Sequence, residues 1–65
     1  MIQNDNELAV TKERIEYFLG LLSRLRSSSR PEEFPLVAGG YRSEVERMQR
    51  QVLDYLTRHA SQPAA

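Results

Sequence analysis

Residues 41–56, YRSEVERMQRQVLDYL, decide the fold of this chain. Apolar residues recur along them in alternating steps of three and four, and these steps place side chains on one face of an α-helix. The same spacing runs through residues 11–28, TKERIEYFLGLLSRLRSS. Two amphipathic helices joined by a short connection form a helical hairpin, so we predict an all-α fold with two antiparallel helices.

Both stretches carry more apolar residues than a narrow two-position seam needs. A wide apolar stripe is typical of a helix with more than one neighbour, as in a bundle. We therefore expect two or more hairpins to assemble into a four-helix bundle, as a homodimer or a higher oligomer. The residues predicted for its core and oligomer interface are Ile15, Phe18, Leu19, Leu22, Leu25, Tyr41, Val45, Met48, Val52, Tyr55 and Leu56.

The small size of the chain also favours assembly. A domain of 65 residues buries only about 60% of its unfolded surface, so small folds often need a disulfide, a metal or a partner. The sequence has no cysteine and one histidine, which excludes disulfides and argues against a metal site. Oligomerisation is the remaining means of stabilisation, and we expect no cofactor.

The start of the first helix has two interpretations. Thr11 is the preferred start, because a threonine hydroxyl at this position accepts a hydrogen bond from an amide of the first turn. This start gives a first helix over 11–28 and leaves 1–10 as an N-terminal extension. A start at Asp5 or Asn6 is the alternative.

The start of the second helix is also open. Ser43 and Glu46 have the spacing of a capping box, which predicts a helix over about 41–60. The alternative is a start at Pro35, since proline is favoured in the first turn of a helix. In that case Gly39-Gly40 lies inside the helix rather than in a loop.

The charge and hydropathy of the sequence limit which partners and cellular environments we expect. Nine Lys and Arg residues balance nine Asp and Glu residues, which gives no general attraction to nucleic acid or to anionic membranes. The longest apolar stretch, residues 17–22, is far shorter than the roughly twenty residues that span a bilayer. We expect a cytoplasmic protein without a membrane segment, and a disordered tail over 61–65.

Arg24, Arg26 and Arg30 form the one local cluster of positive charge in the sequence. They are candidates for contact with an anion or a nucleic acid. The simpler interpretation is a solvated helix end, where cations complement the helix dipole. The balanced net charge argues against a nucleic-acid-binding domain.

No catalytic constellation is present. Glu32-Glu33 is the one pair of adjacent acids, and it stands beside a proline in a predicted loop. The sequence contains no phosphate-binding glycine loop, no metal-ligand cluster and no pairing of a nucleophile with a base. We therefore expect a protein that is not an enzyme.

Short motifs in both halves of the chain carry a resemblance to a known family. They are Met1-Ile2-Gln3-Asn4, Glu7, Val10-Thr11-Lys12 and Phe18, and then Tyr41-Arg42-Ser43-Glu44 through Tyr55-Leu56. Together they resemble the N-terminal helical hairpin of bacterial Xre-type helix-turn-helix antitoxins and regulators. The resemblance implies a self-associating hairpin in a bacterial cytoplasmic protein. In that family a DNA-binding domain follows, whereas here no recognition helix is present, so DNA binding is not carried over.

The leading hypothesis is a small oligomerisation or protein-interaction module, antitoxin-like or regulatory, whose first partner is a second copy of itself. One alternative is nucleic-acid binding by an assembled bundle that gathers the clustered arginines. Another is an adaptor that stays disordered until a partner protein covers its apolar stripe.

Overall fold

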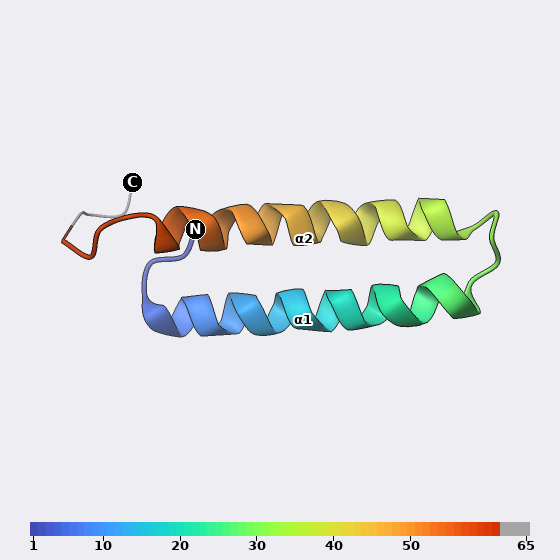
Figure 1. The fold of residues 1–65 in the computed structure, drawn as a ribbon, viewed down its shortest axis with the longest axis horizontal. Coiled ribbons are helices and arrows are strands. Elements are labelled where there is room, and N and C mark those ends of the chain that lie inside the picture. Colours follow the sequence, from blue (N-terminus) through green and yellow to red (C-terminus); the bar gives the residue numbers. More distant parts are fainter. Residues whose placement is uncertain (62–65) are drawn as a thin grey trace.

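The computed structural model describes residues 1–61, which form two long α-helices joined by a short turn (Figure 1). Helix α1 spans Asp5–Ser28 and helix α2 spans Phe34–Leu56. The helices lie side by side and run antiparallel, so the N-terminus lies beside the end of α2. The predicted all-α fold of two packed helices is confirmed. The end of the predicted tail, residues 62–65, lies outside the described residues.

Helix α1 begins earlier than the preferred prediction. Asn4 caps it, because its Oδ1 accepts a hydrogen bond of 2.8 Å from the N–H of Glu7. In return, Oε1 of Glu7 accepts a bond of 2.8 Å from the N–H of Gln3. The Thr11 hydroxyl donates to the carbonyl of Glu7 at 2.9 Å, a bond made inside the helix. The start at Thr11 is therefore wrong, and most of the expected extension is helical from Asp5 onward.

The turn between the helices is built from local hydrogen bonds. Helix α1 ends at Ser28, where the N–H of Ser29 donates to the carbonyl of Leu25 at 2.9 Å. After Arg30 the chain turns through residues 31–33, and the N–H of Phe34 donates to the carbonyl of Arg30 at 3.0 Å. The sequence placed this end correctly, since a proline after Arg30 disfavours helical geometry there.

Helix α2 begins at Phe34 and passes through Gly39-Gly40 without a break. The predicted start at residue 41 is therefore wrong, and the alternative of an early start is correct to within one residue. Pro35 occupies the first turn, where its missing N–H costs nothing. The two glycines disfavour helix by about 1 kcal/mol each, so packing against α1 must offset them.

The predicted capping box of Ser43 and Glu46 does not form, because both residues lie inside α2. Oε1 of Glu46 instead accepts a hydrogen bond of 2.7 Å from Nε of Arg42, one turn earlier. The spacing of Ser43 and Glu46 correctly predicts a helix but wrongly predicts that the helix starts there.

Helix α2 ends at Leu56, about one turn before the predicted end near residue 60. The N–H and hydroxyl of Thr57 both donate to the carbonyl of Leu53, at 2.9 and 2.7 Å. The next amide, of Arg58, donates at 3.3 Å to the carbonyl of Tyr55, three residues back. This tighter turn closes the helix and is a common form of helix end.

The core is a small apolar cluster midway along the hairpin. Ile15 from α1 is buried against Val45 and Met48 from α2, with Phe18 and Val52 packed around them. The three central residues, Ile15, Val45 and Met48, are each at most 8% exposed. A core of this size leaves much of the apolar surface of both helices uncovered.

Two contacts fix the register of the helices. Near the termini, the hydroxyl of Tyr55 donates to Oδ1 of Asp5 at 2.7 Å. Nearer the turn, the rings of Phe18 and Tyr41 lie with centroids 5.6 Å apart. Residues joined by such contacts lie at about the same level along the hairpin. These two contacts therefore set approximately which residues of α1 lie beside which residues of α2.

Candidate interaction surface

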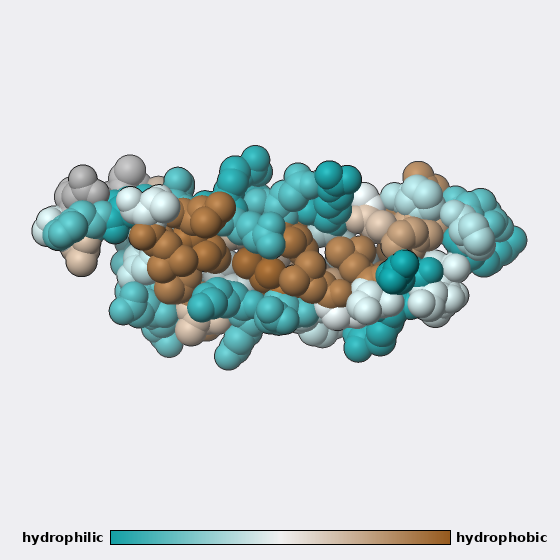
Figure 2. All heavy atoms as spheres, viewed as in Figure 1, coloured by the Kyte–Doolittle hydropathy of each residue, from teal (hydrophilic) through white to brown (hydrophobic). Residues whose placement is uncertain are grey.

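One long side of the hairpin carries two parallel rows of side chains, and we call it the open side. Successive members of each row are three or four residues apart, so each row lies along one side of its helix. The rows are Lys12, Glu16, Leu19, Ser23 and Arg26 on α1, and Pro35, Gly39, Arg42, Glu46, Gln49, Leu53 and Leu56 on α2. Figure 2 shows apolar side chains gathered in a broken stripe along the seam between the helices.

Two hollows lie between the rows of the open side. The first has a volume of about 460 Å³, and its apolar lining is Ile15, Val52 and Leu53. The second, nearer the turn, has a volume of about 570 Å³ and reaches from Leu19 across to Gly39. A Cβ added at Gly39 would meet no atom within 4 Å, so this hollow has room for a side chain from outside.

Three leucines of the open side project into solvent. Leu19 is 42% exposed, Leu53 is 60% exposed and Leu56 is 57% exposed. A single exposed leucine needs no explanation, but apolar side chains that adjoin one another along one side mark an interaction surface. The open side combines such side chains with hollows that similar side chains would fill.

The opposite long side, the covered side, is partly closed by the chain itself, and the two hollows left on it are smaller, at about 290 and 220 Å³. Its residues Tyr41, Met48 and Tyr55 are seven residues apart on α2 and so lie along one side of that helix. Met48 is 4% exposed, and the ring of Tyr41 lies against Phe18. Ile2, in the segment before α1, is folded over this side and is 3% exposed. The two sides of the hairpin therefore differ: Val10 and Val37 stay partly exposed on the covered side, whereas the open side exposes three leucines beside its two hollows.

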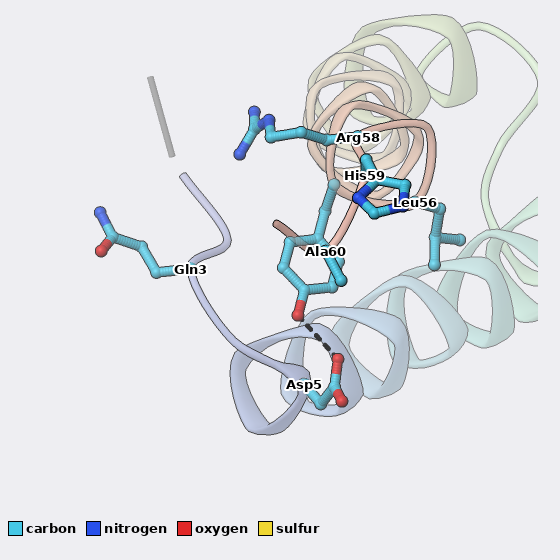
Figure 3. Close-up of a pocket in the computed structure, with 7 residues that line it drawn as sticks. Gln3, Asp5, Leu56, Arg58, His59 and Ala60 are labelled. Carbon is cyan, nitrogen blue, oxygen red and sulfur yellow. Dashed lines mark hydrogen bonds between the residues drawn. The ribbon is translucent and has the colours of Figure 1, made fainter. Parts of the chain in front are cut away.

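A third hollow, of about 330 Å³, lies at the end of the hairpin where the termini meet (Figure 3). Asp5 points across it toward the tyrosine hydroxyl to which it is hydrogen-bonded. That bond, followed by burial and by the negative charges of Asp5 and Glu7, raises the pKa of Tyr55 above its usual 10.0. The hollow is mostly polar, and the bond between Asp5 and Tyr55 joins the two ends of the hairpin across it.

The residues predicted for the core and interface fall into three groups. Ile15, Val45 and Met48 are buried, whereas Leu19 and Leu56 are exposed on the open side. The half-buried remainder lies along the seam and comprises Phe18, Leu22, Leu25, Tyr41, Val52 and Tyr55. Their assignment to an oligomer interface stays a prediction.

Two apolar residues were absent from that prediction. Leu53 lies three residues before Leu56 and four after Gln49, a spacing that would have placed it in the same row. Ile2 precedes the helix, where periodicity carries no signal. It is buried where the extended Asn4 cap leads the preceding chain over the covered side.

The structure does not bring the three arginines together in one patch. Arg24 and Arg26 are two residues apart on α1, and such residues point to different sides of a helix. Arg26 lines the hollow near the turn. Arg30 lies in the turn, where its guanidinium contacts Glu32 at 3.1 Å and Glu33 at 3.6 Å.

Over residues 1–61, no group of three or more His, Cys, Asp or Glu side chains is arranged to hold a metal ion. Within the same residues, neither helix is long and apolar enough to cross a membrane. The open side, with its exposed leucines and two hollows, is the feature of the described residues that best fits a binding role.

Comparison of the chain with models of protein families, with curated proteins and with solved structures finds no match. The resemblance to the hairpin of Xre-type regulators therefore stays a prediction, and the function is argued from the geometry.

Proposed function

We propose that this chain is a small non-enzymatic interaction module that associates with itself through its open side. The observation that carries the proposal is the difference between the two long sides. Ile2 and Tyr41 partly close one of them, whereas Leu19, Leu53 and Leu56 stand exposed beside the two larger hollows on the other. Burying such side chains contributes roughly 1.5–3 kcal/mol each, which favours association.

A regulatory or antitoxin-like role belongs to the same proposal. It is supported by the resemblance of the motifs to Xre-type hairpins, in which the hairpin holds copies of a regulator together. The open side is the surface through which this chain would do so.

The molar mass in solution tests the proposal. Light scattering over a concentration series should give a multiple of the 7.5 kDa chain mass, and the melting temperature should rise with concentration. A chain that keeps the monomer mass at every concentration would contradict it. A chain with little helix by circular dichroism would instead favour the adaptor that folds on binding.

Nucleic-acid binding receives no support from the placement of the arginines. Arg24 and Arg26 diverge, and Arg30 is paired with acids in the turn. Gel-shift or fluorescence assays at about 50 mM salt, where phosphate contacts are strong, should detect no binding to DNA or RNA.

A further inference from the structure

We infer that two copies cover each other's open sides in an antiparallel dimer, with the turns at opposite ends and a two-fold axis near Glu46. This inference rests on the proposed self-association and adds the identity and orientation of the partner. A two-fold axis makes both copies use the same surface, so the open side must be complementary to itself.

The exposed area of the chain fits a second copy. The chain exposes 5157 Å². A compact monomer of 7.5 kDa exposes about 4,200 Å², which is about 900 Å² less. A stable interface buries about 800 Å² on each partner, so one partner of the same size would cover the excess.

The open side of α2 is self-complementary about Glu46, because an exposed side chain on one side of Glu46 matches a hollow on the other. Leu53 and Gly39 each lie seven residues from Glu46, so an axis there places Leu53 of one copy opposite Gly39 of the other. The exposed Leu53 then faces the hollow beside Gly39, where a side chain has room. Leu56 lies ten residues from Glu46 and Pro35 lies eleven, so the axis also places these two at nearly the same level, and each contact occurs twice.

Charges near the ends of α1 agree with this orientation, whereas the centre brings like charges of the two copies together. The hollow linings place Glu16 beside Gln49 and Leu19 beside Arg42, so Glu16 lies within about one helical turn of the level of Glu46 and the axis also passes near it. Asp5 and Arg26 lie about equally far from Glu16 in opposite directions, and the dimer brings these opposite charges together. At the axis, Glu16 of one copy faces Glu16 of the other and Glu46 faces Glu46, with Lys12 one helical turn from each Glu16.

A parallel dimer, with both turns at the same end, would lack these matches. Helix α1 of one copy would then face α2 of the other at the same level. Glu16 would lie opposite Glu46, and Leu19 would lie opposite Arg42. Like charges meet at the centre in both orientations, but in the parallel one Leu53 lies at the level of Lys12 and leaves the hollow beside Gly39 unfilled.

Single cysteines test the inference, because the chain has none of its own. In the antiparallel dimer, Glu16→Cys and Glu46→Cys each lie near the axis, so each should form a disulfide between identical chains on mild oxidation. Glu44→Cys, on the covered side of α2, is the matched control. Proximity within the dimer should make the first two variants react roughly tenfold faster or more than the control.

The possible outcomes test separately the orientation of the dimer, the choice of side and self-association. Rapid disulfides at Glu16→Cys and at Glu46→Cys, with a slow control, support the antiparallel dimer. A rapid disulfide only in a mixture of the two variants indicates the parallel dimer and overturns the inference. A faster reaction at Glu44→Cys overturns the choice of side. In these last two cases light scattering on the reduced variants still gives a dimer, whereas a monomer mass overturns the proposed function itself.

Discussion

The hydroxyl of Tyr55 donates a hydrogen bond of 2.7 Å to Oδ1 of Asp5 and thereby joins the end of α2 to the start of α1. This bond raises the pKa of Tyr55 above 10.0. A raised pKa in the folded state means that folding favours the neutral phenol. The stabilisation is therefore fully present below the unfolded pKa and is lost as pH rises through the higher folded pKa. Thermal melts across this alkaline range should show a falling melting temperature, and tyrosine absorbance should reveal one late-titrating phenol.

The variant Tyr55→Phe isolates that bond. It should lower the melting temperature at neutral pH and remove the late-titrating phenol from the absorbance titration. Tyr17→Phe is the matched control, because Tyr17 is 62% exposed and lies away from the hairpin end. Equal melting temperatures for the two variants would show that the bond between Asp5 and Tyr55 does not stabilise the hairpin.

The variant Leu53→Asp should dissociate the dimer while leaving the hairpin folded. Leu53 is 60% exposed in the single chain, so the charge costs little there, but in the dimer it would be buried twice. We expect the dissociation constant, measured by sedimentation, to rise roughly a hundredfold. Leu36→Asp is the control, since Leu36 is 82% exposed on the outer face of α2. A loss of assembly in Leu36→Asp as well would place the interface elsewhere.

The helical periodicity predicted the architecture because spacing determines which side chains can share a face. It identified Ile15, Val45 and Met48, which form the core, and it could not choose between two starts for each helix. At α1 the choice depends on Asn4, which accepts from the N–H of Glu7, and on Glu7, whose carboxylate accepts from the N–H of Gln3.

The division into an open and a covered side was beyond the sequence for a similar reason. It depends on Ile2, which belongs to no periodic stretch, and on which long side of the hairpin the N-terminal segment covers. Helix propensity also misplaced the start of α2, because two adjacent glycines resemble a loop. Their intrinsic cost is outweighed by the packing of the residues on either side.

The variant Gly40→Ala should stabilise the hairpin by about 1 kcal/mol, the difference in helix propensity. A Cβ at Gly40 would meet no atom within 4 Å, so nothing opposes the gain. Urea denaturation at a fixed chain concentration measures it. Gly39→Leu provides the contrast, because a large side chain there would fill the hollow that receives Leu53 and should weaken association. If Gly39→Leu associates as well as the wild type, that hollow is not part of the interface.

The variant Ile2→Ala should destabilise the monomer more than its place in the sequence suggests. Residues near a chain terminus usually contribute little, but Ile2 is 3% exposed against the covered side. Removing a buried isoleucine side chain costs roughly 2 kcal/mol or more, and the loss should appear as a lower urea midpoint with an unchanged slope. Met1→Ala is the neighbouring control, since Met1 is 63% exposed and should change the midpoint little. Because Ile2 lies away from the open side, the dimer dissociation constant of Ile2→Ala should stay near that of the wild type wherever the variant is folded. A midpoint equal to that of Met1→Ala would mean that the covered side is closed by α1 and α2 alone.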